Sequence, residues 1–332
     1  MVSVVISCFN SVAYLDLAIE SVLTQTFADL ELVLVDDGSS DDTWAIIRRY
    51  AGQDRRITPI QKMNTGVADS LNVGIREAKG KWIARLDADD IAIPNRLELQ
   101  LSYLSHNKDL VLVGGGCIEI DSLGRQIKEF TYPEIHGKLL RRLVKGLAFF
   151  PHSSSMYRKS DVLRLGGYNP RFTRSQDSDL WLRIGENGTI ACLPKPIIML
   201  RKHSESISHH DQGKTQRLMG TAARICHLLR LRELPDPSQG ELDVWGGFMD
   251  WLAKRLQEEG FLESNEAWMT LRQEWYGAES HRLLNRGIAL SKQLVESPVL
   301  LRIALHNLFG SNAAIRLTDE WVNLKSLSGQ IG

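Results

Sequence analysis

The feature that most restricts the fold of this chain is a regular alternation of two patterns between residues 2 and about 120. Short runs rich in β-branched residues take turns with longer stretches whose apolar residues share one helix face, as Leu15, Ile19 and Val22 do. Such alternation is typical of a parallel sheet covered by helices, so we predict an α/β fold with a mostly parallel, Rossmann-like sheet. The predicted strands lie at 2–7, 30–35, 57–61, 82–86 and 110–115, with a further short strand at 196–200.

The composition changes near residue 211, where β-branched runs become rare. Leu, Arg, Glu and Trp are frequent from there on, and apolar residues such as Leu252 and Leu256 keep helical spacing. A segment with proline and glycine at 234–241 breaks this region into at least two parts. We therefore predict a catalytic domain at 1–210 and a helical domain at 211–332.

Charge and composition exclude several classes of protein. The chain has 40 Lys and Arg against 40 Asp and Glu, so its net charge gives no sign of nucleic-acid binding. Its four cysteines lack paired spacing, which argues against a structural zinc site or a disulfide framework. No apolar run reaches the roughly 18 residues needed to cross a bilayer, and the N-terminus lacks the features of a signal peptide. We expect a cytoplasmic protein, with peripheral contact at the inner membrane face left open.

Polar residues follow three of the predicted strands, at the point where each strand ends. Ligands of open parallel sheets bind outside the carboxyl ends of the strands, where backbone groups are free. Three strand ends thus bring carboxylates to one rim, which is costly unless a cation or a hydrogen-bonding ligand is present. The residues are Ser7, Phe9 and Asn10 after the first strand, Asp36 and Asp37 after the second, and Asp87, Asp89 and Asp90 after the strand at 82–86.

The cluster that indicates one kind of site most specifically is the acidic run from Asp87 to Asp90. Mg²⁺ or Mn²⁺ held by one or two carboxylates can accept phosphate oxygens in its remaining positions. Such an ion would neutralise the charge that builds on a leaving diphosphate. The alternative is a helix cap, because short acidic runs are common in capping turns and Asp90 precedes a helical pattern. The position after a buried strand favours the metal site.

Two further polar segments could bind a nucleotide. In the segment at 36–43, Asp37 could accept a nucleobase N–H or a ribose hydroxyl, whereas Asp41 or Asp42 is expected to cap a helix. In the segment at 64–74, Gly66 could let the backbone approach the nucleotide closely, or could simply begin a helix. The candidate residues of this third element are Asn64, Gly66, Ser70 and Asn72.

Together these segments resemble the N-terminal half of family 2 inverting glycosyltransferases with the GT-A fold. The resemblance rests on several motifs in the same order and covers roughly residues 2–208. It implies that Ser7, Phe9 and Asp37 hold the nucleobase, that Asp87 lies near the ribose and that Asp89 binds the metal. Ser7 stands where the family usually has Pro or Thr, and Phe9 stands where it usually has Tyr, so the base-binding residues depart from the family pattern.

The same resemblance implies a catalytic carboxylate in the segment QDSDLWLRI at 176–184. Asp177 is the candidate general base, which would take the proton of the acceptor hydroxyl as its oxygen attacks the anomeric carbon opposite the diphosphate. Asp179 is the nearest rival, and helix capping is the alternative for either residue. The aromatic ring of Trp181 could contact an acceptor sugar, although an aromatic residue in such a run is more often part of the core.

The segment at 201–208 resembles the loop that closes over the diphosphate in this family. His203 could be a third metal ligand, since imidazole suits Mn²⁺ better than Mg²⁺, and Arg201 or Lys202 could meet phosphate oxygens. A lone histidine in a polar loop is more often simply solvated.

We therefore expect an inverting glycosyltransferase that moves a sugar from a nucleoside-diphosphate sugar, with UDP favoured, to a saccharide or lipid-linked saccharide. Two rivals remain: a sugar nucleotidyltransferase, which normally has a Gly- and Arg-rich loop after the first strand that this chain lacks, and a non-catalytic nucleotide-sugar sensor. The basic segment 281–332, with apolar clusters such as 299–309, could lie on an anionic membrane or pack against the catalytic domain or a second subunit. A homodimer is left open.

Overall fold

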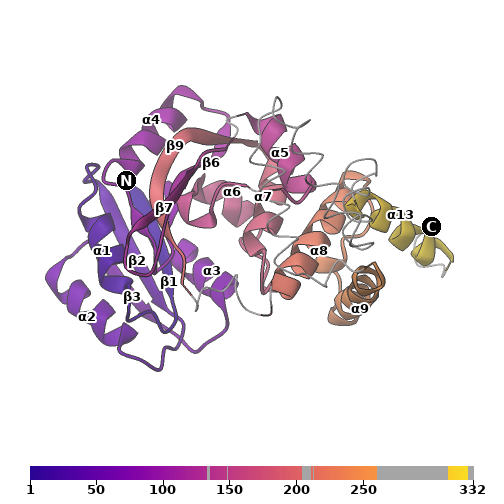
Figure 1. Ribbon diagram of the computed structural model, residues 1–332, viewed down its shortest axis with the longest axis horizontal. Helices are drawn as coiled ribbons and strands as arrows, with labels where there is room; N and C mark the ends of the chain where they lie inside the picture. Colours follow the sequence, from indigo (N-terminus) through magenta and orange to yellow (C-terminus); the bar gives the residue numbers. More distant parts are fainter. Residues whose placement is uncertain (133–134, 148, 204–210, 212, 260–312, 328–332) are drawn as a thin grey trace, which may run out of the picture. The chain divides into compact units, whose positions relative to one another are not determined.

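The computed structural model describes residues 1–132, 135–147, 149–203, 211, 213–259 and 313–327. The chain divides into two compact units, Met1–Ser206 and Ile207–Gly332. Every strand in the described part belongs to the first unit, and the described part of the second unit is helical (Figure 1). The division falls four residues before the boundary predicted at 210.

The first unit is built on one mixed sheet, which confirms the predicted α/β fold. Its described strands lie in the order β3-β2-β1-β4-β8-β6-β9-β5, and β7 pairs with β6. Because β1 is parallel to β2 and β4, and β2 is parallel to β3, these four strands end at one edge. Their bounds are Val2–Cys8 for β1, Leu30–Asp36 for β2, Ile57–Gln61 for β3 and Trp82–Arg85 for β4.

Successive side chains of a strand point to opposite faces of the sheet, so this parallel part presents side chains on both faces. Helices cover both of these faces (Figure 1). In β1, Val4 and Ile6 belong to the hydrophobic cluster that includes Ile19 of α1. Val5 faces the other side, where a Cβ on Gly74 of α3 would lie 2.5 Å from its Cγ1, so only glycine fits. The helices of this part are α1 Leu15–Leu23, α2 Thr43–Gln53 and α3 Val67–Glu77.

The remaining strands extend the sheet with mixed directions. The long strands β6 and β9 pair in parallel, β8 is antiparallel to both β4 and β6, and β5 is antiparallel to β9. The pairing of β6 with β9 shifts near Gly115 and Gly116, where β9 carries Pro194 and Pro196. Proline lacks the N–H that a ladder needs, which explains why the sequence predicted only a short strand at 196–200. The bounds are Ile91–Ala92 for β5, Leu110–Ile120 for β6, Gln126–Phe130 for β7, Met156–Arg158 for β8 and Thr189–Arg201 for β9.

Four further helices belong to the first unit. They are α4 Arg96–His106, α5 His136–Val144, α6 Lys159–Arg164 and α7 Gln176–Asn187. The side chain of Trp181 in α7 is 1% exposed and its ring packs near those of Phe150 and Tyr157. This burial supports the core interpretation of Trp181 over contact with an acceptor sugar.

The described part of the second unit contains α8 Lys214–Leu231, α9 Leu242–Glu258 and α13 Ala313–Leu327. The predicted break at 234–241 contains a short 3₁₀ turn between α8 and α9. The aromatic rings of Phe248, Trp251 and Trp321 pack together between α9 and α13. Most of the basic segment 281–332, including the apolar cluster 299–309, lies outside the described residues. In the described part of this segment, Arg316 pairs with Glu259 and Glu320.

Candidate active site

The ends of β1 and β2 lie side by side and are tied together. Cys8 is in register with Asp36, and the backbone N–H of Asp37 donates to the carbonyl of Cys8 over 2.8 Å. Asn10 joins the two loops, because its N–H donates to Ser39 Oγ and its side-chain oxygen accepts from the N–H of Ser40. Two candidate base-binding residues, Ser7 and Phe9, thus flank the loop of Asp36 and Asp37. The ring of Phe9 is 50% exposed, so it is free to stack on a ligand.

Asp37 is held by the segment that precedes α3. Its Oδ1 accepts from Lys62 Nζ over 2.6 Å and from the N–H of Thr65 over 3.0 Å, and its Oδ2 accepts from the N–H of Gly66 over 2.9 Å. Gly66 has φ of 95°, a conformation that favours glycine, and it immediately precedes α3. The structure therefore brings Asp37 and Gly66 together, and it gives Gly66 the role of helix start that the sequence left as an alternative.

Not every candidate residue on this rim faces outward. Asp36 is fully buried, and its carboxylate accepts from Gln61 Nε2 and from the N–H of Ser39. Ser70 is buried in α3, with its hydroxyl 3.4 Å from Lys62 Nζ. Asn64 is exposed and lies beside Gly38, because a Cβ added to Gly38 would be 2.8 Å from the backbone nitrogen of Asn64. Asp36 and Ser70 thus support the loops from inside.

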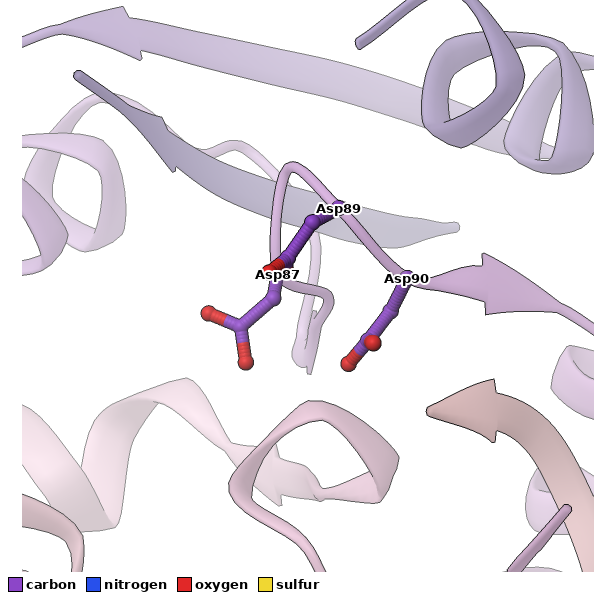
Figure 2. Close-up of side chains that lie close together, drawn as sticks. All are labelled: Asp87, Asp89 and Asp90. Atoms are coloured by element: carbon purple, nitrogen blue, oxygen red, sulfur yellow. The ribbon is translucent and has the colours of Figure 1, made fainter. Parts of the chain in front are cut away.

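The acidic run after β4 forms the centre of the rim. Figure 2 shows Asp87, Asp89 and Asp90 on one tight loop, with the carboxylates of Asp87 and Asp90 pointing the same way. Carboxylate oxygens of the three residues lie within 4.8 Å of one another. The N–H of Asp87 donates to Ser153 Oγ over 2.8 Å, which anchors the loop to the turn before β8. Oxygen ligands at such spacing are what Mg²⁺ and Mn²⁺ prefer.

Asp90 is the most deeply buried of the three acids. Its side chain is 1% exposed, its Oδ1 accepts from the N–H of Arg201 over 2.8 Å, and its Oδ2 has no hydrogen-bond donor among the described residues. Burial, together with the charges of Asp87 and Asp89, raises the pKa of Asp90 well above its usual value. Asp90 therefore does not cap a helix, since α4 begins only at Arg96. A cation would relieve this buried charge, so the residues fit a divalent ion.

His203 reaches the same cluster from the end of β9. Its Nε2 lies 2.9 Å from Asp89 Oδ2, and its ring packs against Tyr14. Burial and the neighbouring Asp87 raise the pKa of Asp89, although His203 acts in the opposite direction. The structure thus places His203 in contact with Asp89, and the prediction that both bind one metal ion stays a prediction.

Arg201 was a candidate for contact with phosphate oxygens, but the structure places its side chain inside the protein. Its guanidinium donates to the carbonyl oxygens of Asp89, Asp121 and Ser122, lies over the ring of Tyr14, and is 4% exposed. These contacts fasten the acidic loop to β9. Lys202, whose Nζ lies 3.4 Å from Glu119 Oε1, is therefore the remaining candidate for a phosphate contact.

Arg85 is a member of the site that the sequence interpretation missed. It is the last residue of β4, its side chain is 3% exposed, and its Nη1 forms an ion pair with Asp87 Oδ2. Burial alone would lower the pKa of this guanidinium, but Asp87, Tyr168 and Asp90 together outweigh burial and raise it. The available signal was a charged residue closing the apolar strand WIAR, since buried arginines are rare unless paired.

Asp177 lies in the first turn of α7, where helix N–H groups favour a negative charge. Burial raises its pKa, Arg85 lowers it, and Asp87 raises it, so all three groups share one electrostatic environment. Asp179 is fully buried and binds Arg183 through its Oδ2 over 2.6 Å and 2.9 Å. Because Asp179 is committed to this pair, Asp177 is the better candidate for a general base.

Comparison with known proteins agrees with this geometry. The family model described as Glycosyl transferase family 2 matches residues 3–166. A glycosyltransferase of Haemophilus influenzae is 30% identical over 231 residues, covering 65% of this chain and 70% of that protein. The chain belongs to glycosyl transferase family 2. It is a glycosyltransferase that uses a nucleotide-sugar donor.

A further glycosyltransferase and two solved structures are also similar to this chain. The O-antigen biosynthesis glycosyltransferase WbnJ of Escherichia coli is 36% identical over 188 residues, covering 55% of this chain and 71% of WbnJ. Residues 1–349 of Staphylococcus aureus TarS, in complex with UDP-GlcNAc, superpose with a TM-score of 0.55 at 18% identity, over 70% of this chain and 71% of that one. The mannosyltransferase PcManGT of Pyrobaculum calidifontis, in complex with GDP-Man and Mn²⁺, has a TM-score of 0.53 at 17% identity, over 93% and 87%. Both likenesses concern the fold, and they confirm the predicted GT-A type.

Among the described residues, no helix is both long enough and apolar enough to span a bilayer.

Proposed function

We propose that this family 2 enzyme transfers a sugar from a UDP-sugar to a hydroxyl of a saccharide or lipid-linked saccharide, with inversion at the anomeric carbon and with a divalent cation at its acidic loop. The observation that carries the proposal is the cluster of Asp87, Asp89 and Asp90 on the rim where β1 and β2 also end. Asp177, the candidate base, shares the electrostatic environment of this cluster. Donor, cation and acceptor would therefore meet at one edge of the sheet.

Each side chain has a definite task in this proposal. Phe9 stacks on the base, Asp37 accepts a base N–H, and Asp87 accepts from the ribose. Asp177 accepts the proton of the acceptor hydroxyl while that oxygen bonds to the anomeric carbon and the bond from that carbon to the diphosphate breaks. One displacement needs one base, and it leaves the new bond on the face opposite the departing diphosphate.

The acidic loop would hold Mn²⁺ or Mg²⁺ through Asp89, with Asp87 and His203 as the other predicted ligands. Asp90 adds a carboxylate oxygen that has no donor in the described part of the chain. When bound, the ion supplies positive charge to the leaving diphosphate. The 2.9 Å contact between His203 and Asp89 supports this set, and the solved structure of PcManGT in complex with GDP-Man and Mn²⁺ agrees with it.

The hydrogen bonds of Asp37 favour uracil over guanine. A carboxylate offers about four acceptor positions, and three are taken by Lys62, Thr65 and Gly66. The remaining position, on Oδ2, suits the single N3–H of uracil, whereas guanine presents two adjacent donors. TarS in complex with UDP-GlcNAc has the same fold, although PcManGT with GDP-Man has it too.

The acceptor is proposed from the relatives. WbnJ is described as an enzyme of O-antigen biosynthesis, which makes cell-surface polysaccharide the proposed context. Family membership removes the support for a sugar nucleotidyltransferase, and the presence of Asp87, Asp89 and Asp177 gives no support to a non-catalytic sensor.

The test is a panel of UDP-, GDP- and dTDP-sugars incubated with the protein and Mn²⁺, with release of nucleoside diphosphate as the readout. We expect slow hydrolysis of a UDP-sugar, which stops with EDTA and in Asp89→Asn. Binding of a nucleotide sugar without any hydrolysis would favour the sensor. Preferred cleavage of GDP-sugars would contradict the assignment of the base.

A further inference from the structure

The side chain of Asn72 joins helix α3 to the segment that leads to α7. Its Nδ2 donates to the carbonyl oxygen of Tyr168 over 2.8 Å, and its Oδ1 accepts from the N–H of Tyr168 over 2.8 Å. Asn72 is 9% exposed, so both bonds are made away from water. Asn72 was a candidate for contact with the nucleotide, but the structure uses both ends of its amide on the backbone of Tyr168.

Helix α3 begins at the loop that holds the candidate base-binding carboxylate. The N–H of Gly66, which immediately precedes the helix, donates to Asp37 Oδ2. Ser70 follows on the same helix, with its hydroxyl near Lys62 Nζ. The helix thus meets the donor side of the site at its start and the backbone of Tyr168 through Asn72.

The segment around Tyr168 is also fastened to α7. Arg183 of that helix donates to the carbonyl oxygens of Leu165 and Gly167, over 2.9 Å in each case. The side of this segment that meets α3 is held by Asn72. The segment therefore lies between the two helices and is bonded to both of them.

The ring of Tyr168 makes a third connection, to the acidic loop. Its hydroxyl lies 2.6 Å from His152 Nε2, and the ring is fully buried. Ser153, the next residue after His152, accepts from the N–H of Asp87 over 2.8 Å. Hydrogen bonds and short stretches of chain thus connect α3, α7 and the acidic loop through this one tyrosine.

Two neighbouring glycines show how close the approach of Asn72 is. Gly167 has φ of 75°, and a Cβ added there would collide with Asn72 Oδ1. Gly166 has φ of 81°, but a Cβ added there would meet nothing within 4 Å. The two positions share a backbone conformation that favours glycine, and they differ in contact with Asn72.

We propose that Asn72 is a positioning residue: its amide docks α3 onto the segment at 165–168 and so fixes the distance between the bound donor and Asp177 on α7. The inference rests on the proposed function, because that function places the base on α7. Reacting atoms must be held about 3 to 3.5 Å apart, and a misplacement of about 1 Å can lower a rate about 100-fold. Loss of the amide should therefore lower kcat while nucleotide binding is kept.

The first test compares Asn72→Ala with the control Ser3→Ala, in Mn²⁺-dependent hydrolysis of a UDP-sugar and in calorimetry with UDP. Ser3 is a buried polar residue at the start of β1, at the edge opposite the site, where its hydroxyl donates to Glu31 Oε1. We expect Asn72→Ala to lower kcat by about 10- to 100-fold, with the KM of the donor and the dissociation constant of UDP unchanged. Ser3→Ala should lower the melting temperature and leave kcat unchanged. Equal losses of kcat in the two variants, or weaker UDP binding in Asn72→Ala, would overturn the proposal.

The two glycines separate the contact from backbone strain. Gly167→Ala should lower kcat as Asn72→Ala does, because its Cβ displaces the amide, whereas Gly166→Ala introduces similar strain without touching Asn72. Combined with Asn72→Ala, Gly167→Ala should lower kcat little further, since residues in contact are not additive. Additive losses for Gly167→Ala and Asn72→Ala, or equal losses in Gly166→Ala and Gly167→Ala, would refute the inference. The comparison of the two glycine variants stands even if Asn72→Ala does not fold.

Hydrogen exchange tests the same contact without activity. A wild type that hydrolyses no nucleotide sugar would contradict the proposed function and not the docking of α3 by Asn72. In Asn72→Ala, amide exchange should become faster over 166–178, which includes the first turn of α7, while exchange in β1 and β2 keeps its wild-type rate. Unchanged exchange at the start of α7 would show that Asn72 does not hold this segment.

Discussion

At the scale of single residues, we expect two neighbouring aspartates of α7 to have different roles: Asp177 acts in catalysis and Asp179 stabilises the fold. Asp177 lies in the first turn of α7, where burial raises its pKa and Arg85 lowers it, and it makes no ion pair in the described part of the chain. Asp177→Asn should therefore lower kcat by about 10²- to 10⁴-fold, the usual contribution of a general base. The dissociation constant of UDP, measured by calorimetry, should change little, because the base does not contact the nucleotide. A large loss of UDP affinity with unchanged kcat would refute this role.

Asp90 leads to a prediction about the protein without a cation. Its pKa is raised, so the folded state binds a proton more tightly than the unfolded state, and Asp90 costs stability as pH rises above the usual carboxyl range. Asp90→Asn should therefore raise the free energy of unfolding in EDTA at pH 8 by on the order of 1 kcal/mol. At pH 4 the two proteins should be nearly equal. Denaturant melts at both pH values check this, and a destabilised variant at pH 8 would contradict it.

At the scale of elements, helix α7 is oriented by one buried network. Arg183 pairs with Asp179 and donates to the carbonyl oxygens of Leu165 and Gly167, which ties α7 to the segment that follows α6. Removing one partner of a buried pair leaves an unpaired charge and typically costs 3 to 5 kcal/mol. Asp179→Asn should therefore lower the unfolding midpoint strongly.

The control for this prediction is the variant two residues away. Asp177→Asn should melt near wild type while losing catalysis, whereas Asp179→Asn should lose stability first. If instead Asp179→Asn melts like wild type and is catalytically dead, the assignment of the two aspartates must be exchanged.

At the scale of the whole molecule, the sequence predicted most of the fold because hydrophobic periodicity is a local signal. Strands β1 to β4 lie close to their predicted bounds. Strand β9 was underestimated because Pro194 and Pro196 interrupt its pattern. Arg85 was missed for a different reason: its role depends on burial and on a contact with Asp87, and periodicity reports neither. The roles assigned to Asp37, Asp89 and Asp177 remain predictions.

The raised pKa values of the acidic loop should also make cation binding by the whole protein depend on pH. Burial raises the pKa values of Asp89 and Asp90, so protons compete with Mn²⁺ for the same oxygens. The rise in melting temperature produced by Mn²⁺ with UDP should therefore shrink as pH falls from 8 to 5. A ligand at 100 times its dissociation constant adds about 2.7 kcal/mol, which is large enough to measure. An equal rise at both pH values would argue against carboxylate ligands.

The most direct measurement is a crystal of the protein with UDP and Mn²⁺, in which anomalous scattering locates the metal. We expect one strong peak against the carboxylate of Asp89, with Asp87 or Asp90 beside it and the diphosphate oxygens on its open side. A diphosphate bound without metal, or a peak remote from these three aspartates, would contradict it.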